Sequence, residues 1–222
     1  MNRILSRLLT RFAAPLTMAA ALAAALSAAP AAQAGVIFSD NFDTQGSANA
    51  LNFNGFTNWT VTDGSVDYIR SGVQYGIGCV GGAGGCVDLD GSTNNAGVMS
   101  SKLVYNLLAG TTYLFSLDLS GAQVRDERNT VNFGFATAGN LGSFLAAEMV
   151  TLARTNPFGT YTVVYTPGNN VSARLVIGNT GGDNVGLILD NVLVSSKVPE
   201  PGTLALLGLG LVAVALRRRR AA

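Results

Sequence analysis

The chain has 222 residues and contains no histidine. Histidine is the side chain that titrates near neutral pH without help from its surroundings, and it is the usual base in serine and cysteine nucleophilic catalysis. Its absence excludes Ser-His-Asp and Cys-His catalysis, histidine proton shuttles and histidine metal sites. The chain also lacks a Gly-x-Ser-x-Gly sequence, which presents the nucleophilic serine in α/β-hydrolases.

Charged residues are scarce, at 12% of the chain, and half of the basic ones lie near its ends. Residues 35–198 keep 7 basic against 12 acidic residues, which gives this part of the chain a net charge near −5. A nucleic-acid-binding protein needs a basic face to neutralise phosphates. We therefore expect no nucleic-acid partner.

Only two cysteines are present, Cys79 and Cys86. The segment between them is Val-Gly-Gly-Ala-Gly-Gly, which is short and flexible enough to close a disulfide in an exported protein. Two cysteines without a histidine make a poor metal site. A glycine-rich phosphate loop would need a lysine and a following helix, and neither is predicted here. The sequence therefore predicts a Cys79–Cys86 disulfide at the tip of a hairpin.

The first 34 residues have the three parts of a secretory signal peptide. A basic start is followed by an apolar stretch over residues 13–26 and by a small-x-small site that ends at Ala34. We expect cleavage before Gly35, which makes the secretion translocon and signal peptidase partners of the precursor. A retained membrane helix is the alternative, and Pro30 disfavours it. The basic residues of this segment are Arg3, Arg7 and Arg11.

The end of the chain, residues 198–222, also has three parts in a fixed order. A rigid Pro-Glu-Pro segment precedes an uncharged apolar run over residues 204–216 and a block of four arginines. This tail resembles the PEP-CTERM sorting signal of Gram-negative bacteria, which exosortase-type membrane proteases process. The motif residues are Val198, Pro199, Glu200 and Pro201, and the stop-transfer residues are Arg217, Arg218, Arg219 and Arg220.

The resemblance implies a precursor that crosses the inner membrane once, through a C-terminal transmembrane sorting helix. Its arginine block is expected in the cytoplasm, because arginines next to a membrane span stay on that side. The mature form is then expected at the cell surface or outside the cell. A permanent C-terminal anchor is the alternative, although the apolar run of 13 residues is short for a membrane span.

Residues 35–197 read as one all-β domain without a convincing helix. Short runs rich in valine, isoleucine, threonine, tyrosine and phenylalanine alternate with glycine, asparagine, aspartate and proline. This pattern predicts an antiparallel β-sandwich of jelly-roll type. The segment 146–153 is also compatible with a helical turn. The predicted strands are 36–42, 59–62, 65–70, 73–75, 86–89, 97–102, 112–120, 130–136, 142–152, 160–166, 172–178 and 185–195.

The last predicted strand is apolar on both faces, which is typical of a central strand. Asp190 and Asn191 interrupt it. A carboxylate in that position is costly unless it is paired or bound to a cation. Arg174 is a candidate partner that is distant in the sequence.

Five short segments occur in an order that resembles the galactose-binding-like jelly roll of many carbohydrate-binding modules. In that fold the first and last strands lie together, and acids from both often hold a structural calcium ion. The resemblance therefore implies that Asp43 and Asp190, with Asn41, bind Ca²⁺. The segments are Asn41-Phe42-Asp43, Trp59-Thr60-Val61, Val87-Asp88-Leu89-Asp90-Gly91, Gly110-Thr111-Thr112-Tyr113-Leu114-Phe115-Ser116 and Leu189-Asp190-Asn191-Val192.

Aromatic rings are candidate sugar-binding surfaces, because a flat ring buries area at low entropic cost. Tyr68 and Tyr75 lie close to predicted loops, so they are the candidate ligand residues. Trp59 is the only tryptophan, and we expect it in the core.

Paired carboxylates are the one catalytic chemistry that the composition leaves open, and glycosidases use them. Most of the acids occupy turn-like positions, where aspartate bonds locally. We therefore expect a non-enzymatic, exported protein of the cell envelope or matrix, either polysaccharide-binding or purely structural in a biofilm. A carbohydrate-active enzyme is the alternative. Its candidate acids are Asp63, Asp67, Asp88, Asp90, Asp118, Asp126, Glu127, Glu148 and Asp183.

Overall fold

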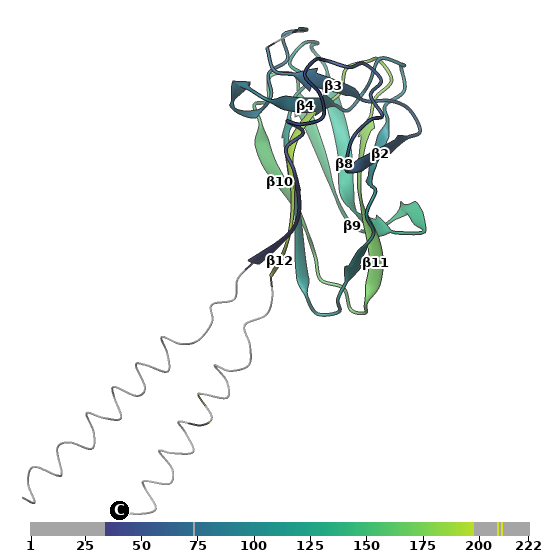
Figure 1. The fold of residues 1–222 in the computed structure, drawn as a ribbon. Coiled ribbons are helices and arrows are strands. Elements are labelled where there is room, and N and C mark those ends of the chain that lie inside the picture. Colours follow the sequence, from purple (N-terminus) through teal and green to yellow (C-terminus); the bar gives the residue numbers. More distant parts are fainter. Residues whose placement is uncertain (1–33, 73, 198–207, 209, 211–222) are drawn as a thin grey trace, which may run out of the picture. The chain divides into compact units, whose positions relative to one another are not determined.

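The computed structural model describes residues 34–72, 74–197, 208 and 210 of the chain, and Figure 1 shows its fold. The described residues from 34 to 197 belong to one compact unit. Most of the predicted signal peptide, the Val198–Pro201 motif, the rest of the predicted transmembrane segment and the block Arg217–Arg220 lie outside the described residues. None of the described helical residues belongs to a helix long and apolar enough to cross a membrane.

Two antiparallel sheets form the domain, and they confirm the predicted jelly-roll sandwich. The first, sheet A, has the strand order β10-β7-β12-β4-β3, with β1 paired to β12. Its strands are β1 (Ala34–Asp40), β3 (Asp67–Arg70), β4 (Gly85–Asp88), β7 (Thr112–Ser120), β10 (Gly159–Tyr165) and β12 (Ile188–Lys197).

The second sheet, sheet B, has the strand order β2-β5-β11-β8-β9, with β6 paired to β11. One short 3₁₀ helix, η1 (Val80–Gly82), precedes β4 in the described chain. The strands of sheet B are β2 (Trp59–Thr62), β5 (Val98–Ser101), β6 (Tyr105–Leu107), β8 (Arg128–Thr137), β9 (Asn140–Ala153) and β11 (Val171–Thr180).

The structure differs from the predicted strands at two places and decides between the strand and the helical turn at a third. The predicted strand 73–75 is wrong where it is described, because Gln74 and Tyr75 lie in a turn and Tyr75 has a φ of 66°. Strand β6 was not predicted. The segment 146–153 is a strand, since Val150 and Leu152 alternate into the core along β9.

The main core lies between the sheets and is rich in aromatic rings. Phe115 of β7 meets Phe133 and Phe135 of β8 edge-on, with ring centroids 5.3 and 5.7 Å apart. Trp59 is fully buried, as expected, and its indole Nε1 donates to Asp40 Oδ2 at 3.0 Å. Edge-to-face packing of this kind adds to the stabilisation from burial.

The central position of β12 is confirmed, because it pairs with β7 on one side and with β1 and β4 on the other. The apolar residues on both faces of β12 result from a β-bulge within the strand. The pairing of β12 with β7 shifts register between Asp190 and Leu193, and Asn191 has a φ of 45°. This β-bulge changes which residues face the core, from Leu189 before it to Val192 after it.

A second, smaller core lies on the other face of sheet A. Cys79 and Cys86 form the predicted disulfide, which joins the loop after β3 to β4. The disulfide packs with three isoleucines and covers the first half of β12 on its outer face. Past the bulge that face is open, and Leu193 is 39% exposed. The isoleucines are Ile69, Ile77 and Ile188.

Candidate functional site

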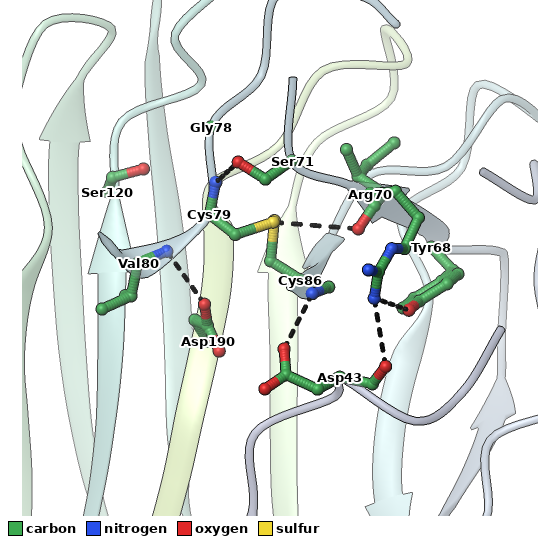
Figure 2. Close-up of a disulfide and its surroundings, with 12 residues drawn as sticks. Asp43, Tyr68, Arg70, Ser71, Gly78, Cys79, Val80, Cys86, Ser120 and Asp190 are labelled. Atoms are coloured by element: carbon green, nitrogen blue, oxygen red, sulfur yellow. Dashed lines mark hydrogen bonds between the residues drawn. A yellow bond between two sulfur atoms is a disulfide. The ribbon is translucent and has the colours of Figure 1, made fainter. Parts of the chain in front are cut away.

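Figure 2 shows Asp43 and Asp190 below the disulfide in the view, with Asp190 beneath Val80 and Asp43 beneath Cys86. Asp190 is 4% exposed and accepts hydrogen bonds from the backbone N–H groups of Val80 (3.0 Å) and Asn191 (2.7 Å). The Asp43 carboxylate accepts from Gly85 N (2.9 Å) and from Asn41 Nδ2 (2.7 Å). Asn41 lies next to Asp43, but its amide nitrogen faces the Asp43 carboxylate and its amide oxygen accepts from Asp43 N at 3.3 Å. Among the described residues, no group of three or more acidic or cysteine side chains is arranged to hold a metal ion.

No basic residue among those described pairs with Asp190, and its charged neighbours are the acids Asp43 and Asp118. Burial raises the pKa of Asp190 to about 6, and the nearby charges of Asp43 and Asp118 add to the shift, whereas the two backbone hydrogen bonds oppose it. Arg174 does not pair with it, because its guanidinium donates to the carbonyls of Ser101 and Lys102. Ca²⁺ takes carboxylate oxygens as ligands, and Asp43 and Asp190 supply two such groups near one another.

A separate cavity of about 270 Å³ opens on sheet A beside the second core. Buried side chains of β3, β4 and the nearby loops line its floor, and exposed loop residues form its rim. The Tyr75 ring is 48% exposed at this rim. The floor consists of Asp67, Ile69, Ile77, Asp88 and Val185, and the rim of Leu51, Tyr75, Ser92, Val124 and Asn184.

Two carboxylates lie side by side in this cavity, because Asp67 of β3 is directly opposite Asp88 of β4. Asp67 is fully engaged, since Oδ1 accepts from Asn52 N and Ser92 N and Oδ2 accepts from the Ser92 hydroxyl. Asp88 Oδ1 accepts from Asp90 N and Gly186 N, and no described residue donates to its Oδ2.

The environment of Asp88 makes it partly protonated at neutral pH. Burial raises its pKa to about 7, with smaller contributions from the charges of Asp67 and Asp90, while the hydrogen bonds from Asp90 N and Gly186 N oppose the shift. A carboxyl in this state can donate or accept a hydrogen bond through its second oxygen. The cavity thus offers an exposed ring at its rim and a versatile polar group on its floor.

A cavity of about 400 Å³ on sheet B also carries an aromatic ring. It lies under the start of β9 and is lined by Phe144, Leu141 and Asn132, among others. Phe144 is half-buried, and the acid that lines this cavity, Asp63, is exposed rather than buried. The Tyr75 cavity therefore combines more of the features of a polar ligand site.

The two tyrosines predicted as ligand residues have different positions. The Tyr75 ring lies exposed at the rim of a cavity, so its ligand role stays a prediction, whereas Tyr68 is only 1% exposed and cannot present its ring to a ligand. Tyr68 packs against Phe53 in the main core, and its hydroxyl donates to Gly46 O at 3.1 Å. The reason is strand alternation, because Tyr68 faces the core while its neighbours Asp67 and Ile69 face the cavity.

Four rim residues, Leu51, Ser92, Val124 and Asn184, were not predicted from the sequence. They come from loops that are far apart in the chain and meet only in the folded domain. No local pattern distinguishes them from other loop residues.

The tail has a direct counterpart among known protein families. Residues 197–220 match the PEP-CTERM protein-sorting motif. This motif implies an exported chain that an exosortase processes. No curated protein sequence matches the chain.

Solved structures resemble the domain in fold. The CBM22-1 xylan-binding domain of Xyn10C from Paenibacillus barcinonensis superposes with a TM-score of 0.50 at 11% identity, covering 77% of this chain and 99% of that domain. At this identity the likeness shows the fold alone, which is that of carbohydrate-binding jelly rolls.

Two further structures are similar at lower TM-scores. The CBM22-1–GH10 xylanase 10B of Clostridium thermocellum, complexed with xylohexaose, has a TM-score of 0.44 at 16% identity, over 73% of this chain and 28% of that one. A CBM4 structure has a TM-score of 0.41 at 16% identity, covering 71% of this chain and 97% of that one.

The raised pKa of Asp88 predicts a specific pH dependence of stability. Between the ordinary value of 3.8 and about 7, the folded state holds a proton that the unfolded state has released, so the free energy of unfolding falls as the pH rises. The slope from this group is roughly 1.4 kcal/mol per pH unit at most. Asp88→Asn has no carboxyl to titrate at this position and so lacks this decrease. The free energy of unfolding of Asp88→Asn minus that of wild type should therefore increase from pH 5 to pH 8.

Chemical denaturation of both proteins at several pH values measures this difference. Asp126→Asn, which removes a carboxylate at an exposed position, is the control for the change in net charge. A stability difference between Asp88→Asn and wild type that does not change between pH 5 and pH 8 would contradict the assignment.

Proposed function

We propose that this protein is a non-enzymatic, exported component of the cell envelope or extracellular matrix, which binds polysaccharide in the Tyr75 cavity. The observation that carries the proposal is the pairing of a half-exposed tyrosine ring with the carboxyl of Asp88 in one cavity. Sugar rings present apolar faces for stacking and hydroxyl groups for hydrogen bonding, and ligand sites combine such groups. The PEP-CTERM motif supports export, and a matrix role in a biofilm agrees with both features.

The cavity favours binding over hydrolysis. Glycosidases place two carboxyl groups on either side of the scissile bond, about 5–10 Å apart. Asp67 and Asp88 are instead neighbours on adjacent strands of one sheet, and Asp67 is held by hydrogen bonds from Asn52 and Ser92. The volume of the cavity, about 270 Å³, is just below the usual range for small-molecule sites and suits the end of a glycan chain.

We also propose that calcium binds between Asp43 and Asp190, with Asn41 as a further oxygen ligand. Asp43 follows β1 and Asp190 belongs to β12, so the ion would fasten the start of the domain to its last strand. Asp190 has the negative charges of Asp43 and Asp118 nearby and no basic partner among the described residues, which supports a cation at this position. The role of the ion would be stability, because a ligand that binds only the folded state raises the free energy of unfolding.

Glycan binding is tested by screening the purified full chain against an array of bacterial and plant polysaccharides, followed by calorimetry with any glycan that binds. Tyr75→Asn should weaken binding about tenfold or more, because it removes the stacking surface. Asparagine is chosen because it tolerates the positive φ of this residue, so the turn is kept.

Phe144→Ala is the matched control, since it removes the ring from the cavity on sheet B. Binding that survives Tyr75→Asn and is lost in Phe144→Ala would move the site to sheet B. An array on which the folded protein binds nothing would contradict polysaccharide binding and favour a purely structural role.

Sorting is tested by replacing Pro199, Glu200 and Pro201 together with alanine. Loss of the rigid motif should leave full-length precursor in the membrane fraction of the producing cell, while wild type is shortened. Immunoblots of cell fractions measure this, with the disulfide variant Cys79→Ser as a control for altered folding. Normal processing of the triple-alanine variant would overturn the sorting assignment.

The calcium proposal is tested by thermal melting of the full chain with calcium and with a chelator. Calcium should raise the melting temperature of wild type, and Asp190→Ala should remove most of this rise. A melting temperature that calcium does not change in wild type, or changes equally in Asp190→Ala, would leave Asp190 as a hydrogen-bonded strand residue.

A further inference from the structure

A second group of buried polar atoms lies where the loop after β4 meets the end of β11. Asp90 follows β4 and has no exposed surface, and Asn179 near the end of β11 is 9% exposed. Asp90 Oδ2 accepts hydrogen bonds from Gly182 N (2.7 Å) and Asp183 N (3.3 Å). Among the described residues, Asp90 Oδ1 and both amide atoms of Asn179 are buried and have no hydrogen-bond partner.

The two side chains converge on one point. A Cβ atom added to Gly181 would collide with both Asp90 Oδ2 and Asn179 Nδ2. Only glycine at this position therefore leaves the two polar groups together. A buried polar group without a partner costs free energy, and three such atoms in one place indicate that something else completes the site.

The surroundings of these oxygens are negatively charged. Burial raises the pKa of Asp90, and the charge of Asp183 adds to this, against the hydrogen bonds from the backbone of Asp183 and Gly182. Burial and the adjacent Asp183 carboxyl also raise the pKa of Glu127. The one ion pair found among the described residues joins Arg125 to Asp183 at 3.3 Å. Asp183 and Glu127 thus share Arg125, and no described basic residue forms an ion pair with Asp90.

We propose that a hard divalent cation of the calcium type binds at Asp90 Oδ1 and the amide oxygen of Asn179. Carboxylate and amide oxygens are ligands of this class of ion. A water molecule could satisfy the hydrogen bonds but would leave the excess negative charge. A bound cation would coordinate the buried oxygens and also balance the negative charge. In that state the Asn179 amide is oriented with its oxygen toward the ion.

This site is separate from the one proposed at Asp43 and Asp190, because it joins β4 to the segment after β11. The same segment continues to Asn184 at the rim of the Tyr75 cavity and to Gly186, whose N–H bonds Asp88 at 2.8 Å. The cation would therefore hold one wall of that cavity in place. Its binding and its effect on stability do not depend on whether a glycan binds there.

Calorimetric titration of the metal-free full chain with calcium chloride tests the proposal. Asp90→Asn should bind one calcium ion fewer per chain than wild type, whatever the number of ions that wild type binds. Asp126→Asn is the matched control, because it removes a nearby exposed acid outside the site, and it should bind as many ions as wild type.

Asn179→Asp tests the site in the opposite direction and covers the case in which Asp90→Asn does not fold. A second carboxylate should raise the calcium affinity of this site about tenfold and lower the melting temperature in chelator. An unchanged number of bound ions in Asp90→Asn would overturn the proposal. So would a melting temperature that Asn179→Asp lowers equally with calcium and with chelator, which is the result expected of a buried water.

Discussion

The backbone pairing of β12 is the constraint on which the rest of the domain depends. This strand alone joins β7 to both β1 and β4, so sheet A is complete only after the last residues of the domain have been added. Figure 1 shows β12 running beside the dark N-terminal strand β1, and β7 separates β12 from β10 in the sheet. Pairing two segments that are distant in the sequence costs loop-closure entropy. Because β12 pairs with three distant strands, its docking closes three such loops.

The position of β12 also separates the two tasks of the chain. At one end of the strand, Lys197 pairs with Ala34, so the expected signal-peptide cleavage point and the residue before the sorting motif are neighbours. At the other end, Ile188 pairs with Asp88 of the cavity floor. The strand has 10 residues, about 33 Å at 3.3 Å per residue. The expected processing points and the cavity proposed to bind ligand thus lie at opposite ends of one strand.

The sequence predicted the strands well because most of them alternate apolar and polar residues with period two, as in β7 and β8. It could not predict the bulge at Asn191, since an unpaired residue leaves the composition of the strand unchanged and only shifts its phase. The same limit explains Tyr68, whose direction depends on the register of β3 against β4. The Asp90–Asn179 group was also beyond reach, because its members are 89 positions apart and meet through tertiary contacts.

The central claim is that β12 holds the domain together, and native-state hydrogen exchange measured residue by residue tests it most directly. Amides that β12 pairs on both sides, near Leu189 and Val194, should exchange only through global unfolding and be among the slowest in the protein. Amides of the edge strand β9 should exchange faster, through local opening. Exchange in β12 that is as fast as in β9 would contradict the account.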